Sequence, residues 1–206
     1  MKITWLGHSC FKVVSDGGSV IFDPYENGSV PGLDDIHTSA QLVLCSHLHF
    51  DHNAVETVQK EDGTCAFTVE TIETFHDDQK GALRGTNTIH IISGGTYRIA
   101  HLGDLGCQLE EQQIEKLKHA DVVLIPVGGH YTIDGDEAAA LIQKIAPSIV
   151  IPMHYRSDSF GFDVISTVKP FLSHFDNVVE LNSDTLEDIE SCRHKVVVLQ
   201  PQLLQK

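Results

Sequence analysis

The stretch Ser46-His47-Leu48-His49-Phe50-Asp51-His52-Asn53 decides how the rest of this sequence is interpreted. Four side chains that can bind a divalent metal fall within six positions, in the order His-x-His-x-Asp-His. On extended chain His47 and His49 would point to the same side, and Asp51 would continue that alternation. His52 breaks the alternation and must come from a turn or a helix start. The pattern therefore suits two metal ions close together rather than one.

A structural role is the alternative explanation for these side chains. One His at the end of a strand is more often hydrogen-bonded than bound to a metal. Three His and one Asp in six positions are harder to explain in that way, because burying such groups without partners costs several kcal/mol each. A solvated loop would tolerate them but would not favour this spacing. The cluster therefore predicts a site for zinc or a related metal.

The residues around the cluster predict a strand before it and a helix after it. The apolar run 42–45 leads into the cluster, and residues 53–60 read as a short helix with Asn53 as its N-cap. Such a junction lies at the carboxyl end of a strand, where α/β proteins usually place their sites. Residues 25–40 are rich in Gly, Pro, Asn and Asp, and they predict a surface loop beside the site.

Length and composition indicate one globular domain over residues 1–206. The apolar share of 41% is ordinary, and no stretch approaches the about 20 apolar residues that span a bilayer. The N-terminus enters a strand at once and lacks the apolar segment of a signal peptide, so we expect a cytoplasmic protein. The five cysteines show no Cys-x-x-Cys spacing, and their odd number argues against a disulfide framework.

The charge balance restricts the partners that we expect. The chain has 14 Lys and Arg against 29 Asp and Glu, a net charge of −15. Such a chain repels nucleic acid and anionic membranes at long range. We therefore expect a small-molecule substrate, with no membrane or nucleic-acid partner. A homo-oligomer is compatible with the sequence, which leaves the oligomeric state open.

Alternating and continuous apolar runs predict the remaining elements. Two hairpins, two short buried strands before and after a helix, and two closing strands are indicated. Asp134 and Glu137 resemble a capping box. The expected strands cover 3–6, 10–14, 19–22, 65–69, 71–75, 89–92, 97–101, 122–125, 149–151, 178–181 and 195–199. The expected helices cover 110–118, 136–146 and 163–173, the last of them bent or interrupted near Pro170. This order predicts two mixed sheets packed face to face with helices outside.

Four strand-like runs end close to a residue of metal-binding type. Residues 42–45 precede His47, residues 71–75 precede His76, residues 97–102 precede Asp104, and residues 149–153 precede His154. A two-sheet fold can bring such strand ends together along one edge. Periodicity alone does not show that they meet.

The sequence resembles the metallo-β-lactamase-fold superfamily of metal-dependent hydrolases from about residue 4 to residue 156. The resemblance is to its short-chain branch, which includes L-ascorbate-6-phosphate lactonase-like predicted zinc-dependent hydrolases. It implies an α/β fold, the αββα sandwich. The segments that carry it, besides the His cluster, are Trp5-Leu6-Gly7-His8-Ser9, Ile21-Phe22-Asp23-Pro24, Phe75-His76-Asp77, Leu102-Gly103-Asp104, Pro126-Val127-Gly128-Gly129 and Ile151-Pro152-Met153-His154-Tyr155.

The resemblance implies a ligand set for two divalent ions. Zinc is favoured, with Mn²⁺ and Fe²⁺ as alternatives because all three accept N and O ligands. His101 competes with His76, but the segment around His76 resembles the equivalent segment of the short-chain branch. In this set His47, His49 and His76 hold the first ion, Asp51, His52 and His154 hold the second, and Asp104 bridges the two.

The implied chemistry is hydrolysis by a hydroxide held between the two ions, whose binding lowers the pKa of water to about 7. Asp51 would ligate and orient the water, Asp104 would keep the ions together, and His130 would be a wall residue or proton donor. Asp77 is a candidate partner for a ligand imidazole. His8 is expected in the pocket wall.

Substrate contacts are expected from the segment 128–131 and from two of the few cations. His130 and Tyr131 lie between a buried strand and a helix. Arg84 and Arg156 would each suit a phosphate or carboxylate, although a solvated surface position explains each equally well.

The favoured activity is hydrolysis of a small ester, lactone or phosphoester, with a lactonase-like reaction slightly preferred. Alternatives are a phosphodiesterase or nuclease, a di-iron redox enzyme and a non-catalytic metal-binding regulatory module. The acidic charge disfavours nucleic acid. The di-iron branch of the resembled family has Glu where this chain has His49, and a complete ligand set disfavours a regulatory module.

Overall fold

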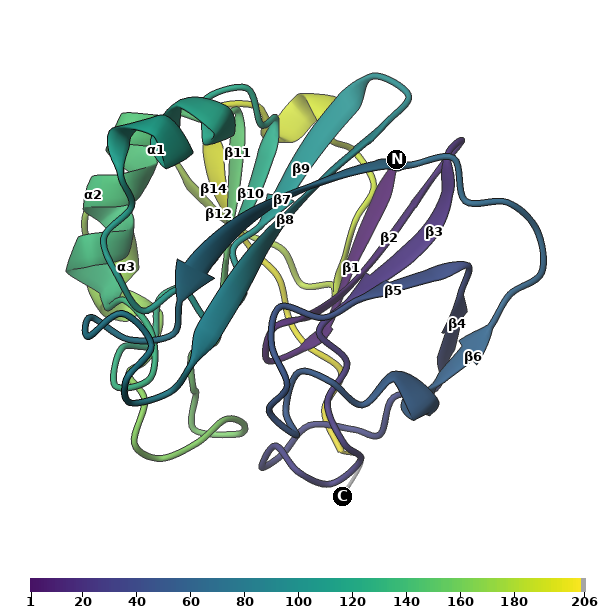
Figure 1. Cartoon of the computed structure of the whole chain (residues 1–206), viewed down its shortest axis with the longest axis horizontal. Coiled ribbons are helices and arrows are strands. Elements are labelled where there is room, and N and C mark those ends of the chain that lie inside the picture. Colours follow the sequence, from purple (N-terminus) through teal and green to yellow (C-terminus); the bar gives the residue numbers. More distant parts are fainter. Residues whose placement is uncertain (205–206) are drawn as a thin grey trace.

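The computed structural model describes residues 1–204 and places two β-sheets face to face (Figure 1). The smaller sheet has five strands in the order β13-β1-β2-β3-β5, and the larger has seven in the order β12-β14-β11-β10-β9-β8-β7. The smaller sheet contains β1 (Lys2–Gly7), β2 (Cys10–Ser15), β3 (Gly18–Phe22), β5 (Leu42–Leu44) and β13 (Thr185–Leu186). The larger contains β7 (Thr68–Phe75), β8 (Thr86–Gly94), β9 (Tyr97–His101), β10 (Val122–Pro126), β11 (Ile149–Met153), β12 (Val178–Glu180) and β14 (Lys195–Val198).

Both sheets are mixed, as the sequence predicts. In the smaller sheet β1, β2 and β3 are antiparallel neighbours, and β5 runs parallel to β3. In the larger sheet β7, β8 and β9 form an antiparallel meander, and the strands from β9 to β12 are parallel. Every residue of β10 and β11 is buried. Continuous apolar strands of this kind are typical of parallel strands covered on both faces.

One apolar core contains residues of both sheets. Trp5 and Phe11 from the smaller sheet are fully buried, as are Ile91, Leu124 and Ile151 from the larger. Each large apolar side chain contributes roughly 1.5–3 kcal/mol when it is fully buried. The indole N–H of Trp5 donates to the carbonyl of His8 at 2.9 Å. This bond ties the core directly to the loop between β1 and β2, which borders the site.

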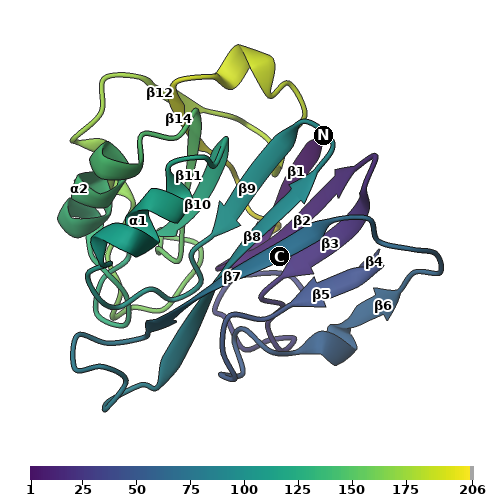
Figure 2. The same ribbon diagram turned by 45° about the horizontal axis from the view of Figure 1, so that its top comes forward.

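The helices lie on the outer face of the larger sheet (Figures 1 and 2). They are α1 (Glu111–Leu117), α2 (Gly135–Ile145) and α3 (Lys169–Leu172). The predicted capping box starts α2: a carboxylate oxygen of Asp134 accepts from the Glu137 N–H, and the Glu137 side chain accepts from the Asp134 N–H. The helix ends at Ile145, and its C-cap Ala146, directly before Pro147, has a left-handed backbone with φ 52°.

The predicted helix 163–173 is wrong, because only α3 is helical there. Pro170 is the second residue of α3. Proline lacks an N–H and collides with the preceding turn, so it is tolerated in the first turn of a helix and not in its interior. Residues 163–168 therefore form an irregular segment that leads into the helix.

The outer face of the smaller sheet is covered by an irregular layer instead of helices. On this face β4 (Thr38–Ala40) and β6 (Val58–Lys60) form a small parallel sheet. Apolar side chains of the loop before β4 pack in the same layer. The prediction of a surface loop over 25–40 is therefore wrong in part. This layer forms a second apolar cluster of Leu6, Cys10, Ile21, Tyr25, Val30, Leu33, Ile36, Ala40 and Val58.

The short helix predicted over 53–60 is also wrong. A single 3₁₀ turn, η1 (Val55–Thr57), precedes β6, and a second 3₁₀ turn, η2 (Glu190–Cys192), precedes β14. The N–H of Ala54 bonds to the carbonyl of Pro24 at 2.8 Å, and residues 58–60 pair with 38–40. These long-range bonds outweigh the local helix preference. The α/β sandwich of two mixed sheets is confirmed, with α-helices on the outer face of the larger sheet only among residues 1–204. Within the same residues no helix is long and apolar enough to cross a bilayer.

Candidate metal centre

The predicted metal-binding residues meet at one edge of the sandwich. His47 follows β5, His76 follows β7, Asp104 follows β9, and His154 follows β11. Two groups of ligand atoms that share no member form there, each with all its members within 4.8 Å of one another, and a third group, Asp23, His47 and His52, takes one imidazole from each of them. One group is His47, His49 and His76, and the other is His8, Asp51, His52 and His154.

Asp104 lies between these two groups. Its Oδ2 is 3.2 Å from the Nε2 atoms of His52 and His154, and 3.4 Å from Nε2 of His76. Nε2 of His47 is 4.0 Å away. The carboxylate is 2% exposed and touches imidazoles of both groups. This is the position that a bridging ligand requires.

The His cluster itself is a run of bends and a turn, not the extended chain that its alternation suggested. The N–H of His52 bonds to the carbonyl of His49 at 3.0 Å, which closes the turn. Nε2 of His47 lies 3.0 Å from Nδ1 of His49. The turn brings His52 into the second group, so the expectation that His52 comes from a turn is confirmed.

Asp23 is a part of the site that the sequence reasoning missed. It follows β3 and is completely buried. Its Oδ1 accepts from the Ser46 N–H at 2.6 Å, and its Oδ2 accepts from Ser46 Oγ at 2.6 Å and from His52 Nδ1 at 2.8 Å. Ser46 Oγ is also 2.9 Å from Nδ1 of His47. Asp23 and Ser46 therefore orient one imidazole of each group through Nδ1. Nε2 of His52 then lies 3.2 Å from Asp104, and Nε2 of His47 lies 4.0 Å from it and 3.0 Å from His49.

His8 contacts the second group directly. Its Nε2 is 3.3 Å from Oδ2 of Asp51, and its ring centroid is 4.2 Å from that of His154. His8, Asp23 and His154 all have left-handed backbones, with φ between 43° and 51°. Strained conformations of non-glycine residues cluster at functional sites, where surrounding contacts hold them in place.

The electrostatics of the cluster separate neutral imidazoles from charged groups. Burial lowers the pKa of His47 to about 3 and that of His8 to about 4, and neighbouring imidazoles act in the same direction. Burial opposes the charge of His52, but the carboxylates of Asp104 and Asp23 outweigh it and hold the pKa of His52 well above its ordinary value. Burial likewise opposes the ionised form of Asp104, yet His154 and His52 hold its pKa well below its ordinary value.

The chemistry of the donor set fits divalent metal ions. Several buried side-chain atoms of the cluster have no hydrogen-bond partner within residues 1–204, among them Nε2 of His52, Nε2 of His154 and Oδ1 of Asp104. Unpaired polar atoms in a protein interior are costly, and metal coordination would compensate for them. Imidazole nitrogens and carboxylate oxygens suit Zn²⁺, Mn²⁺ and Fe²⁺.

The preference for His76 over His101 agrees with the structure, whereas the expectation for Asp77 is corrected. His101 is outside both groups: its Nε2 bonds to the Ser9 carbonyl at 2.8 Å, and its ring stacks on Phe22. Asp77 does not contact an imidazole. Its carboxylate accepts four backbone N–H bonds from its own loop, between 2.7 and 3.0 Å, from Gln79, Gly81, Leu83 and Arg84.

A cleft of about 280 Å³ opens onto the cluster. Arg84 and Tyr131 lie on its wall, with the guanidinium carbon 5.5 Å from the Tyr131 ring centroid. His130 is exposed and does not line this cleft, and its ring lies edge-on to Tyr131. Arg156 does not line it either. The residues that do are His49, Phe50, Asp51, His76, Arg84, Asp104, Tyr131 and Phe162.

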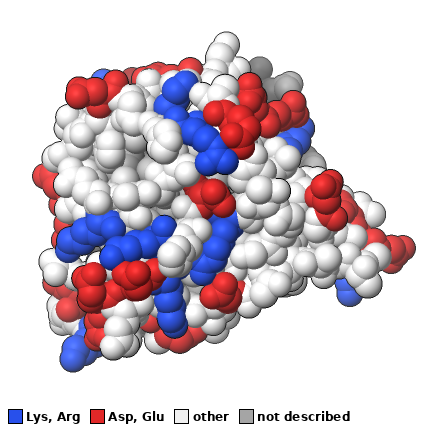
Figure 3. All heavy atoms as spheres, turned by 90° about the horizontal axis from the view of Figure 1, so that it is seen from above, with Lys and Arg blue, Asp and Glu red and all other residues white. Residues whose placement is uncertain are grey.

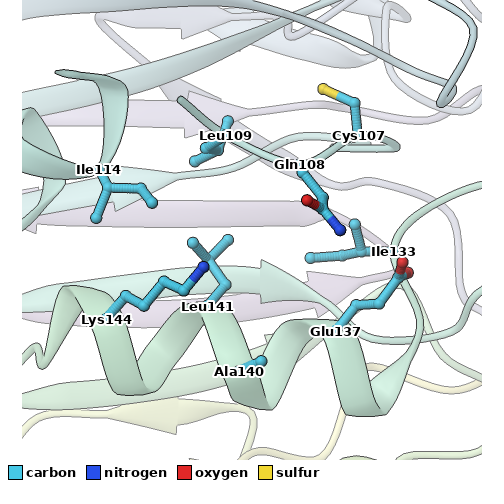
Figure 4. Close-up of a pocket in the computed structure, with 9 residues that line it drawn as sticks. All are labelled: Cys107, Gln108, Leu109, Ile114, Ile133, Glu137, Ala140, Leu141 and Lys144. Atoms are coloured by element: carbon cyan, nitrogen blue, oxygen red, sulfur yellow. The ribbon is translucent and has the colours of Figure 1, made fainter. Parts of the chain in front are cut away.

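A second hollow, of about 160 Å³, lies between residues 107–109 and α2 (Figure 4). Cys107 and Gln108 border it on one side, and Leu141 and Lys144 of α2 border it on the other. Its lining contains no His, and its one carboxylate, Glu137, caps α2. Of these two cavities, only the first is lined by the His and Asp side chains that a metal centre needs.

Gly128 packs closely against the backbone of His154. A substitution at Gly128 therefore tests whether this packing holds His154 in place. A Cβ at this position would lie 2.1 Å from the carbonyl oxygen of His154. We expect Gly128→Ala to cost about 1–3 kcal/mol of stability, as overpacking does. Displacement of His154 should also weaken metal binding. Denaturant unfolding and metal titration would measure both effects.

Gly17→Ala is the matched control, because its added Cβ would meet its nearest neighbour at an ordinary 3.4 Å, in the turn between β2 and β3. If Gly128→Ala bound metal as tightly as the wild type, the role assigned to this packing would be incorrect.

The fold and the site together define a class: a two-sheet sandwich of the metallo-β-lactamase type, with a His and Asp cluster at one edge of its sheets. The comparisons agree with this class. The family model of the beta-lactamase superfamily domain matches residues 2–154. A UPF0173 metal-dependent hydrolase of Methanocaldococcus jannaschii is 30% identical and covers 75% of this chain and 84% of its own length.

Two further proteins match over nearly the whole chain. A UPF0173 metal-dependent hydrolase of Staphylothermus marinus is 29% identical over 97% of this chain and 96% of its own. The crystal structure of a Thermotoga maritima protein, assigned to the Zn-dependent hydrolases of the metallo-β-lactamase superfamily, superposes with a TM-score of 0.77 at 30% identity, over 98% of this chain and 99% of that one. The chain therefore belongs to the β-lactamase superfamily and, within it, to the UPF0173 family.

Proposed function

We propose that the chain is a metal-dependent hydrolase that holds two divalent ions, with zinc favoured and Mn²⁺ or Fe²⁺ as alternatives. The first ion is held by the group of three ligands and the second by three members of the other group, with His8 beside them and Asp104 shared. The proposed ligands are His47, His49 and His76 for the first ion, Asp51, His52 and His154 for the second, and Asp104 for both.

The observation that carries this proposal is the central position of Asp104. One oxygen of its carboxylate lies within 3.4 Å of His52, His76 and His154, which belong to different groups. If the site held a single ion, the ligand atoms of the second group would have no metal ion to bind. The relatives' description as metal-dependent hydrolases supports the same reaction class.

Bound metal ions would supply Lewis acidity and lower the pKa of water to about 7. The protein's own contribution is orientation. The carboxylate of Asp51 lines the cleft and is held by His8, so it can position a water molecule for attack. Tyr131 lines the same cleft and is the better placed proton donor, because His130 faces solvent.

The cleft fits a small ester, lactone or phosphoester. Its volume of about 280 Å³ suits a small molecule, and the net charge of −15 repels nucleic acid. We therefore favour a small-molecule hydrolase over a nuclease or a non-catalytic metal-binding module.

Metal analysis joined to a hydrolysis screen tests this function. We expect about two ions per chain in protein loaded with Zn²⁺, Mn²⁺ or Fe²⁺, and hydrolysis of at least one lactone, ester or phosphoester probe. Chelation should abolish the activity, and added metal should restore it. His76→Ala should lose metal and activity, whereas His37→Ala, which removes an exposed loop histidine, should keep both. Fewer than one ion per chain under metal-replete conditions would exclude the two-metal site.

A further inference from the structure

We propose that the natural substrate carries an anionic group, a carboxylate or phosphate, which Arg84 binds, joined to an apolar segment that lies against Phe50 and Phe162. This inference rests on the proposed function, because it concerns the substrate of the same cleft. It specifies a substrate class that the metal ligands alone do not determine.

Arg84 differs from the other arginines of the described chain in having no partner. Within residues 1–204, its guanidinium makes no hydrogen bond and no ion pair. The others are each held by the protein: Arg98 by Glu70 and the Lys116 carbonyl, Arg156 by the Ile165 carbonyl, and Arg193 by Glu190. Arg156 is therefore fastened to its own loop through Nε, and Arg84 is the arginine of residues 1–204 whose guanidinium has no hydrogen-bond partner at any nitrogen.

The loop that carries Arg84 is fixed in place. Asp77 accepts backbone N–H bonds from four residues of this loop, and the shortest, at 2.7 Å, comes from Arg84 itself. The carboxylate of Asp77 is buried, so solvent does not compete for these bonds. A side chain presented on a pre-ordered backbone loses less entropy when it binds a ligand.

The Tyr131 ring positions the guanidinium without using its N–H donors. The two groups are 5.5 Å apart, which is within the range of a cation–π contact. Arg84 therefore keeps its five planar N–H donors for an acceptor in the cleft, and their geometry matches a carboxylate or phosphate. In a chain of net charge −15, this cation and the proposed metal ions are the features of the cleft that attract an anion.

Elsewhere the positive charges are mixed with negative ones. Figure 3 shows Lys and Arg side chains beside Asp and Glu on one face of the molecule. Ion pairs such as Lys118 with Glu115 and Lys2 with Glu187 account for this kind of surface. Arg84, by contrast, lines the cleft and has no acidic partner within residues 1–204.

The walls of the cleft are apolar where they are not metal-binding. Phe50 and Phe162 line it, and Phe50 is 52% exposed. The neighbouring loops carry further exposed apolar side chains: Leu48 is 83% exposed, Leu83 60% and Val164 55%. Such a rim would gain from contact with an apolar segment of the substrate, which removes it from water.

Matched esters test this proposal on the metal-loaded protein. Mono(4-nitrophenyl) adipate carries a terminal carboxylate, and 4-nitrophenyl hexanoate is its neutral counterpart with the same chain length. We expect kcat/KM to favour the anionic ester by about tenfold to a hundredfold, the range for a hydrogen bond to a charged group. In Arg84→Met this preference should fall to near unity, mainly through KM. 4-Nitrophenyl acetate should be a poorer substrate than the hexanoate because it lacks the apolar chain.

Lys80→Met is the control, because it removes one positive charge from the same loop at an exposed position outside this cleft. It should keep the preference, which excludes a general effect of net charge. Two results would overturn the proposal: no preference for the anionic ester in the wild type, or an unchanged preference in Arg84→Met.

A binding measurement distinguishes the failure of this inference from the failure of the proposed function. If neither ester is hydrolysed, the hydrolase proposal fails for esters, and the anion site is tested alone by calorimetric titration of hexanoate and hexyl phosphate. Binding to the metal ions would be equal in wild type and Arg84→Met, so weaker binding to the variant measures the arginine. The ligand with the larger loss identifies carboxylate or phosphate as the preferred group, and equal binding of both ligands to both proteins refutes the anion site.

Discussion

Asp104→Asn is expected to lower kcat/KM by roughly a thousandfold or more, the equivalent of about 4 kcal/mol. The substitution keeps the shape of the side chain and removes its charge. In the structure that charge is placed 3.2 Å from His52 and His154 and 3.4 Å from His76, so it serves both proposed ions at once. No other carboxylate within residues 1–204 lies that close to imidazoles of both groups.

The metal content and the thermal stability should change together in this variant. A ligand that binds only the folded state stabilises it by about 2.7 kcal/mol at a hundred times its Kd. We therefore expect added metal to raise the Tm of the wild type and to raise that of Asp104→Asn much less. Asp136→Asn is a matched control, since Asp136 is an exposed acid in α2 that pairs with His174. Full metal content and full activity in Asp104→Asn would refute the bridging role.

The sequence predicted those parts of the site that follow directly from a strand. His76, Asp104 and His154 each come one to three residues after a strand, and strand ends of one sheet meet at one edge. The spacing of the His cluster then supplied a second, local signal. Both signals come from short stretches of sequence, so they can be recognised without knowing how the loops fold.

The rest of the site depends on contacts that no local pattern encodes. Asp23 directly follows the apolar run 20–22, which is a recognisable signal for a functional position, but its bonds to Ser46 and His52 span more than twenty residues. Asp77 turns toward its own loop instead of toward a ligand. Arg84 and Arg156 look alike in sequence, but in the structure Arg84 lines the cleft, whereas Arg156 lies outside it and bonds to the Ile165 carbonyl.

The same division between local sequence patterns and long-range contacts applies to the fold. Alternating and continuous apolar runs indicated most of the strands of both sheets, because those patterns report burial directly. The irregular layer of Tyr25, Val30, Leu33 and Ile36 has no period, so its burial was not foreseen. The predicted helix over 163–173 was expected to bend or break near Pro170, and only α3 is helical there because proline prevents a continuous helix.

Asp23→Asn is expected to weaken metal binding by about 10- to 100-fold, although Asp23 is not itself a proposed ligand. Oδ2 of Asp23 accepts from both Ser46 Oγ and His52 Nδ1. An amide nitrogen at this position would face those donors with donors of its own, and an amide oxygen turned toward them would leave the Ser46 N–H without its acceptor. Either way a buried hydrogen bond is lost, and His52 is no longer held with Nε2 directed at Asp104.

A loss of stability of about 3–5 kcal/mol is also expected, because breaking a buried charged pair leaves the remaining partner uncompensated. Ser46→Ala separates this cost from the effect on the metal. It removes the link to His47 but keeps the bond between Asp23 and His52, so its metal affinity should fall less. Metal titration at a temperature where all variants are folded measures the affinities.

The double variant then tests whether Asp23 and Ser46 act as one unit. Residues that share a network are not additive, so the double variant should lose less affinity than the sum of the single losses. Strict additivity would mean that the two residues orient His47 and His52 independently. In that case the connection between the two metal positions would run only through Asp104, and Asp23 would support just the second of them.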